Sequence, residues 1–105
     1  MTRKLVFTES AKAVLAGLQN NRTERARYKQ VAKTLGLLET NLRHPSLQTH
    51  KFQSLRCTNG VEIFEVYAQQ QTEGAYRVFF FYGQDIIKKK KRTRVLTIIA
   101  IEPHP

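Results

Sequence analysis

Residues 75–82 read Ala-Tyr-Arg-Val-Phe-Phe-Phe-Tyr, and this stretch decides the fold. Aromatic and β-branched side chains are typical of a strand. The stretch is apolar almost throughout, which predicts a strand in the middle of a sheet with both faces at least partly covered. The rest of the chain is therefore expected to build a sheet around these residues and to supply what covers it.

One cation interrupts this predicted strand. Because strand side chains alternate with a period of two, Arg77 lies on the same face as Phe79 and Phe81. A guanidinium there has lost part of its hydration and cannot release its proton, so it needs an anion. Two sources stay open: a carboxylate of the protein, from Glu62 or Glu65 on a neighbouring strand, or a phosphate of a ligand.

The first forty residues predict a short strand and two helices. Residues 5–7 are apolar, and Thr8 is placed to cap a helix in which Ala11, Val14, Leu15 and Leu18 form one buried face. Residues 20–21 break this helix. A second helix is predicted over residues 23–42 and is expected to end at Pro45, which has no N–H to donate. Two helices so close together in sequence predict a helical hairpin.

The second half of the chain predicts a sheet. Residues 43–60 are a polar connection, and strands are expected at residues 61–68, 75–82 and 95–101. The short turn between the first two favours an antiparallel meander. Residues 83–94 carry six cations and are expected to be either a long basic hairpin or a loose loop. With the N-terminal strand this gives a four-stranded sheet and a single α+β domain over residues 1–105.

The composition indicates a polyanionic partner. Among 105 residues, 18 Lys and Arg against 8 Asp and Glu give a net charge of +10 and a pI near 10.2. Such a balance favours nucleic acid, the ribosome, an anionic membrane or an acidic protein as partner. No apolar run approaches the length of about 20 residues that spans a membrane. The single cysteine, Cys57, excludes an internal disulfide and fits a cytoplasmic setting.

The residues that carry chemistry are cations and hydroxyls. The chain has no Gly-rich phosphate loop, no paired-carboxylate site and no zinc-type spacing of Cys and His, so neither a metal nor a cofactor is expected. Metal-free cleavage of RNA needs a base for the ribose 2′-OH, a cation on the phosphorane oxygens and an acid for the leaving oxygen. The candidate catalytic residues are Arg77 for the phosphate and His50 or His104 for proton transfer.

A second set of residues is expected to bind RNA. Each member has a plainer alternative: Lys51 and Arg56 as surface cations, Tyr82 as a packing residue, the loop cations as a solvated run, and His104 as a frayed end. The predicted RNA-binding residues are Lys51, Arg56, Tyr82, Lys88, Lys89, Lys90, Lys91 and Arg92.

Taken together, these features resemble the RelE/ParE superfamily of small bacterial toxins from type II toxin–antitoxin systems. The resemblance covers nearly the whole chain. It rests on the order strand, helical hairpin, meander, and on three segments, which read RHPSLQTHKF (43–52), AYRVFFFY (75–82) and VLTIIAIEPH (95–104).

The resemblance implies a four-stranded antiparallel sheet and an acidic antitoxin as partner. In the RelE-like branch it implies cleavage of mRNA on the ribosome without a metal, and in the ParE-like branch inhibition of DNA gyrase. By position, Arg77 matches the arginine of the central strand, and His104 falls where the family has an arginine or histidine. Where RelE-type toxins carry lysines in the preceding strand, this chain has Glu65 and Tyr67.

Three functions therefore stay open at this point. The first is a ribosome-dependent mRNA endonuclease that inhibits translation. The second is a gyrase inhibitor or a catalytically inactive protein of the same fold that only binds. The third is an unrelated basic RNA-binding module in which the rings of residues 79–82 stack on bases.

Overall fold

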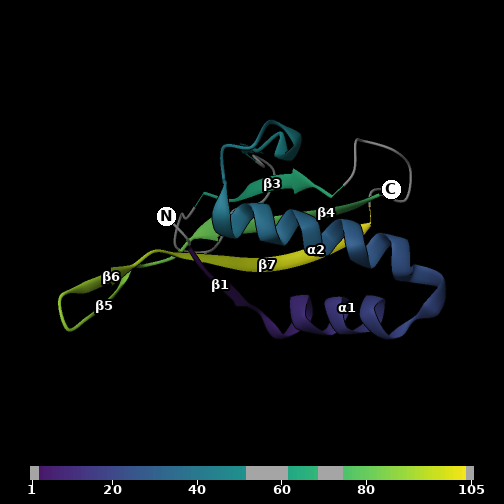
Figure 1. Ribbon diagram of the computed structural model, residues 1–105, viewed down its shortest axis with the longest axis horizontal. Coiled ribbons are helices and arrows are strands. Elements are labelled where there is room, and N and C mark those ends of the chain that lie inside the picture. Colours follow the sequence, from purple (N-terminus) through teal and green to yellow (C-terminus); the bar gives the residue numbers. More distant parts are fainter. Residues whose placement is uncertain (1–2, 52–61, 69–74, 104–105) are drawn as a thin grey trace.

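The computed structural model describes residues 3–51, 62–68 and 75–103 of the chain, and Figure 1 shows their arrangement. The helices are α1 (Glu9–Asn20) and α2 (Arg25–Thr40), with short 3₁₀ helices η1 (Arg22–Glu24) and η2 (Pro45–Leu47). The strands are β1 (Lys4–Phe7), β2 (His50–Lys51), β3 (Phe64–Tyr67), β4 (Tyr76–Tyr82), β5 (Ile86–Lys88), β6 (Lys91–Thr93) and β7 (Val95–Pro103).

Five of these strands form one mixed sheet in the order β1-β7-β4-β3-β2. The pairs β3–β4 and β4–β7 are antiparallel, so the predicted α+β class, the central place of β4 and the meander are confirmed. The predicted count of four strands is wrong, because β2 pairs with the outer side of β3. The predicted antiparallel sheet is also wrong at its other edge, where β1 lies parallel to β7.

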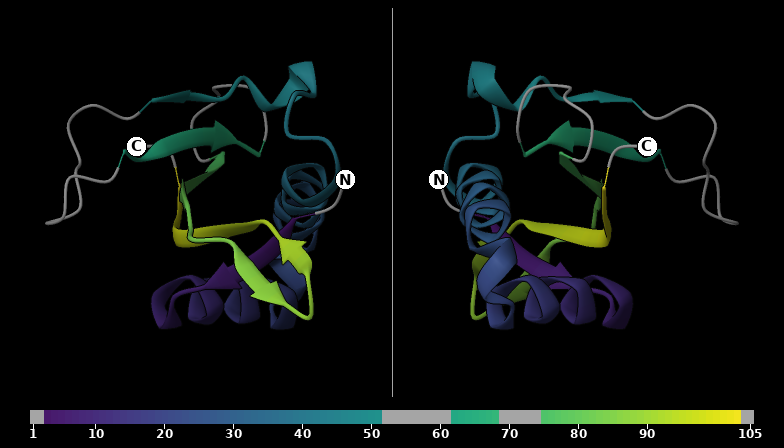
Figure 2. Two further views of the ribbon diagram at one scale, coloured as in Figure 1. Left: turned by 90° about the vertical axis from the view of Figure 1, so that its left-hand side faces the viewer. Right: turned by 90° about the vertical axis from the view of Figure 1, so that its right-hand side faces the viewer.

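The two helices pack against one face of the sheet, as Figures 1 and 2 show from three sides. Alternation along the strands directs every second side chain toward them. The core between helices and sheet is fully buried at Leu38, Val78, Phe80, Leu96 and Ile98. Because burial of each such side chain contributes about 1.5–3 kcal/mol, this layer is the main source of stability.

The start of α1 is fixed by Thr8, as predicted. Its hydroxyl oxygen accepts a hydrogen bond from the backbone N–H of Ala11 at 3.2 Å, which satisfies one of the free N–H groups of the first helical turn. The same hydroxyl donates to the carbonyl oxygen of Ile99 at 2.9 Å. One side chain therefore both begins the helix and ties it to β7.

The second helix is shorter than predicted at both ends. Residues 22–24 form the 3₁₀ helix η1, which Asn21 caps by accepting from the N–H of Thr23 at 3.0 Å. At the other end α2 stops at Thr40, before Pro45 can act. The hydroxyl of Thr40 donates to the carbonyl oxygen of Gly36 at 2.7 Å and so competes with the backbone for that acceptor.

The segment that includes residues 83–94 forms a small separate sheet. Strands β5 and β6 pair with each other only, and Figure 1 shows this hairpin extending beyond the end of the main sheet. Of the two alternatives left open by the sequence, the hairpin is therefore correct. Its base is close-packed at Gly83, where an added Cβ would lie 3.2 Å from Thr97 Oγ1 and 3.2 Å from Val95 Cγ1.

Candidate functional site

Three ionisable side chains meet on the sheet face that the helices leave uncovered. The carboxylate of Glu65 lies between a histidine and an arginine: its Oε1 is 2.6 Å from Nε2 of His50, and its Oε2 is 3.1 Å from Nη1 of Arg77. We call His50, Glu65 and Arg77 the ion triad. It joins two of the three residues that the sequence predicted to be catalytic, although they are 27 positions apart.

The register of the sheet places these residues. His50 of β2 pairs directly with Glu65 of β3, and Arg77 of β4 pairs with Tyr67, two residues further along β3. Side chains of directly paired residues share a face, and diagonal neighbours are within reach of long side chains. Alternation then directs Val66 and Val78 to the helices and the triad to the opposite face.

Burial differs strongly within the triad. The Glu65 side chain is 3% exposed, that of Arg77 20% and that of His50 44%. A buried carboxylate needs charged or hydrogen-bonding partners, and here each oxygen has one. Glu65 therefore organises the site, while His50 is its most accessible member.

Both ring nitrogens of His50 face oxygen acceptors. Nδ1 lies 2.9 Å from the carbonyl oxygen of Gln48, and Nε2 lies 2.6 Å from Glu65 Oε1. A carbonyl oxygen and an ionised carboxylate only accept, so both bonds are satisfied when both nitrogens carry protons. In this arrangement both ring nitrogens of His50 are engaged, and the ring is held in place.

Aromatic rings flank the triad. The guanidinium of Arg77 lies 5.0 Å from the ring centroid of Phe79, and the ring of His50 stacks on Tyr67 with centroids 5.9 Å apart. Burial raises the pKa of the Tyr67 hydroxyl, and the negative charge of Glu65 raises it further. The two ring contacts fix the orientation of the His50 ring and of the Arg77 guanidinium without using their N–H groups.

Arg77 keeps hydrogen-bonding capacity that no partner uses. Its Nε is buried and has no hydrogen-bond partner among the described residues. Across the sheet it is paired in register with Glu102 of β7, whose neighbour Pro103 is the last described residue. His104, the third predicted catalytic residue, follows immediately in sequence and lies outside the described residues, as does Arg56.

The predicted RNA-binding residues that the structure describes do not form one surface with the triad. Lys51 is beside His50, but its Nζ lies 3.2 Å from Oε1 of Glu62. Tyr82 lies on the helix side of the sheet, where its ring packs edge-on against Phe64 and Phe80 at centroid distances of 5.2 and 5.9 Å. It is 49% exposed, so part of its ring still faces solvent.

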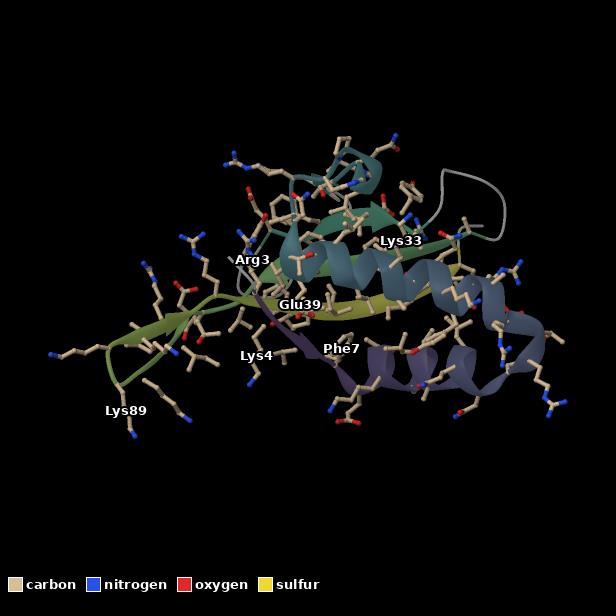
Figure 3. The ribbon with its side chains drawn as sticks, in the orientation of Figure 1. Arg3, Lys4, Phe7, Lys33, Glu39 and Lys89 are labelled. Atoms are coloured by element: carbon tan, nitrogen blue, oxygen red, sulfur yellow. The ribbon has the colours of Figure 1, made fainter. Side chains whose placement is uncertain are left out.

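The remaining predicted RNA-binding residues gather on the β5–β6 hairpin, and Figure 3 shows Lys89 at its tip, far from the body of the protein. Nε of Arg92 is 2.7 Å from Oδ2 of Asp85. Within the described ranges no carboxylate pairs with the other members, which are Lys88, Lys89, Lys90 and Lys91.

The sequence did not indicate one further feature, a cavity of about 480 Å³ between β1 and α2. Its wall includes the apolar side chains of Phe7 and Leu35, and Arg3, Lys4 and Glu39 add charge (Figure 3). The backbone N–H of Arg3 donates to the carbonyl oxygen of Glu39 at 2.8 Å, which joins the two walls. The cavity lies near β1, at the opposite edge of the sheet from the β2 strand that carries His50.

The part of the chain that the structure describes has no group of three His, Cys, Asp or Glu side chains placed to hold a metal ion. Within the same residues no helix is both long and apolar enough to cross a bilayer. Comparison with known proteins gives no match to a family model, a curated protein or a solved structure. The functional argument therefore rests on the geometry of this chain.

Proposed function

We propose that this protein is a toxin of the RelE/ParE type that arrests translation by cleaving mRNA on the ribosome without a metal ion. The observation that carries the proposal is the ion triad, in which one buried carboxylate holds His50 at 2.6 Å and Arg77 at 3.1 Å. The order of β1, the helical pair and the β3-β4-β7 meander supports the proposal, because the resemblance to this superfamily rests in part on that order of elements.

The triad supplies two of the three groups that the reaction needs. The ribose 2′-oxygen forms a bond to phosphorus and loses its proton to a base, while the P–O5′ bond breaks and the leaving oxygen takes a proton from an acid. His50, whose side chain is 44% exposed and whose ring is held by the carboxylate of Glu65, is the candidate for the acid. The guanidinium of Arg77, whose side chain is 20% exposed, is the candidate for the phosphorane oxygens. His104 is the candidate for the base.

The test is pulse-labelling after induction of the protein alone in a bacterial host. We expect incorporation of amino acids to fall first, with thymidine incorporation initially spared. His50→Gln and Arg77→Met are expected to abolish the arrest, whereas Lys12→Gln, which removes an exposed cation of α1, is expected to retain it. Circular dichroism of each purified variant establishes that it is folded. Full toxicity of folded His50→Gln would overturn the catalytic assignment.

One observation favours a second candidate, a protein of the same type that only binds, such as a gyrase inhibitor. Both ring nitrogens of His50 are engaged, and Glu65 meets the charge of Arg77, so the carboxylate of the triad has both its partners without any ligand. On this reading the triad only stabilises the sheet. Thymidine incorporation would then fall before amino-acid incorporation, and folded variants at His50 would stay toxic.

The partner proposed with either function is an acidic antitoxin. It is supported by the net charge of +10, because oppositely charged proteins associate quickly and specifically. Co-expression with the product of the neighbouring reading frame tests this. We expect the two proteins to copurify at low salt and the toxicity to disappear; separate elution with toxicity unchanged would remove this partner.

A further inference from the structure

The turn that joins β5 to β6 has an unfavourable sequence for its backbone shape. Lys88 and Lys91 are paired in register, so the turn consists of two residues, Lys89 and Lys90. Their φ angles are 48° and 65°, in the left-handed region. A two-residue turn of this type normally uses Asn-Gly, Asp-Gly or Gly-Gly, because a Cβ is strained at positive φ.

The charges at this tip destabilise the hairpin further. Lys88 and Lys91 lie directly opposite each other, and like charges opposite each other destabilise a strand pair. No carboxylate among the described residues pairs with any of the four lysines. All the residues of β5 are exposed, so the hairpin gains little from burial.

The tip of the hairpin combines lysines at positive φ with like charges placed opposite each other, and no contact among the described residues offsets either cost. Such a combination indicates that the tip binds something outside the protein. Four ammonium groups concentrated on two strands and their turn match a row of phosphates, since lysine binds phosphate as a point charge without reading base identity. Figure 3 shows that Lys89 lies at the far end of the hairpin, where a bulky ligand has access.

We propose that the β5–β6 hairpin is an arm that binds the phosphate backbone of a folded RNA through Lys88, Lys89, Lys90 and Lys91. The choice of RNA as the polyanion rests on the proposed function, and the binding arm itself rests on the geometry of the turn. The lysines at the turn make the hairpin less stable than Asn-Gly would, but they place two more positive charges at its tip.

The variant Lys89→Asn/Lys90→Gly tests this, because it separates the two effects. It gives the turn the sequence that its φ angles favour and removes two charges. We expect slower amide hydrogen exchange in residues 86–93, by about fivefold or more, since two strained residues are relieved. At the same time RNA binding should weaken. If the turn had only a structural role, the hairpin would become more stable in this variant and RNA binding would become tighter or stay unchanged.

Binding is measured by fluorescence anisotropy of the purified full chain with a labelled RNA hairpin, over a series of salt concentrations. Loss of two phosphate contacts predicts that the slope of log K against log salt decreases by about 1.4–1.8, and that affinity at 0.1 M salt falls by about 25- to 60-fold. The control is Lys29→Gln/Lys33→Gln, which removes two exposed lysines of α2 and leaves the hairpin unchanged.

Two results would overturn the proposal that the hairpin is a phosphate-binding arm. One is unchanged RNA affinity and salt slope in the hairpin variant, and the other is an equal loss in the α2 control, which would indicate net charge alone. Tighter binding of a DNA hairpin of the same sequence would overturn the choice of RNA. None of these readouts depends on cleavage or on arrest of translation, so a failure of the proposed toxin function leaves this measurement interpretable.

Discussion

Nη1 of Arg77 lies 3.1 Å from Oε2 of Glu65, so the cation of the central strand has its anion on the neighbouring strand. The sequence left this anion open between a carboxylate of the protein and a phosphate. The structure gives the carboxylate, while the buried Nε of Arg77 still has no partner among the described residues. Two roles of the ion triad can therefore be tested: stabilisation of the sheet by the ion pair, and binding of a phosphate with proton transfer.

The first prediction concerns the contribution of the triad to stability. Glu65→Gln removes the charge that faces His50 and Arg77 and is expected to lower the free energy of unfolding by about 3 kcal/mol, because Arg77 loses its buried counter-ion and His50 loses its carboxylate partner. Urea denaturation at pH 7 measures it. Glu62→Gln is the control: its pair with Lys51 is largely exposed, with 64% and 55% of the two side chains accessible, so the loss should be below about 1 kcal/mol. Equal losses in the two variants would mean that the triad contributes nothing beyond surface charge.

The second prediction uses Tyr67, whose hydroxyl has a raised pKa because it is partly buried and lies near Glu65. The unfolded chain releases this proton near pH 10, earlier than the native protein does. The native state then binds more protons than the unfolded state, so stability is unaffected below pH 10 and decreases as the pH rises above it.

Tyr67→Phe removes the hydroxyl and with it this contribution to the decrease in stability above pH 10. Urea denaturation at pH 9 and at pH 11 should therefore give a smaller decrease in stability for Tyr67→Phe than for the unmodified protein. The comparison cancels the other tyrosines and the lysines, which titrate in both proteins. An identical decrease would show that the environment of Tyr67 does not favour its neutral form.

The third prediction contrasts two glycines. Gly83→Ala places a Cβ 3.2 Å from Thr97 Oγ1 and from Val95 Cγ1, at the point where the chain leaves β4, and should destabilise the protein by about 1–3 kcal/mol. Gly36 lies inside α2, and no atom would be within 4 Å of a Cβ there. Gly36→Ala should therefore stabilise the protein by about 0.5–1 kcal/mol. Thermal unfolding of both variants checks this pair of opposite signs.

The fourth prediction compares two aromatic residues on the same face of β4. Phe80 is 0% exposed and Tyr82 is 49% exposed. Phe80→Ala leaves a cavity in the core and is expected to cost about 3–5 kcal/mol. Tyr82→Ala removes a ring that solvent already reaches, so its cost should be less than half of that. If Tyr82 were the more costly of the two, the assignment of the core to the helix side of β4 would be wrong.

Sequence reasoning predicted the features that depend on neighbouring residues. The cap at Thr8, the two helices and the central strand β4 each follow from a local pattern of apolar side chains and hydrogen-bonding groups. The strand β2 was missed because its two residues, His50 and Lys51, are polar and exposed and form a strand only through pairing with β3. The pairing joins residues about 15 positions apart, so it cannot be predicted from the residues next to His50 and Lys51.

The same limit applies to the site. Arg77 was recognised as an unusual cation, but its partner depends on which residues of β3 lie beside it, and that is set by the register of the whole sheet. Since β2 was missed, the bond between His50 and Glu65 was missed as well. Glu65 and Tyr67 on one face, alternating with Phe64 and Val66, were the available signal. The strain at Lys89 and Lys90 had no such signal, because it resides in backbone angles.

The parallel pairing of β1 with β7 has a consequence for the order in which the protein folds. Lys4 pairs with Val95, and Phe7 with Ile98, so this contact closes a loop of about 90 residues. Contacts between residues so distant in sequence form slowly, because the chain must lose much entropy before they are made. During synthesis β1 is made about 90 residues before its partner strand β7. The sheet, and with it the setting of Arg77 between β3 and β7, can be completed only after β7 has been made.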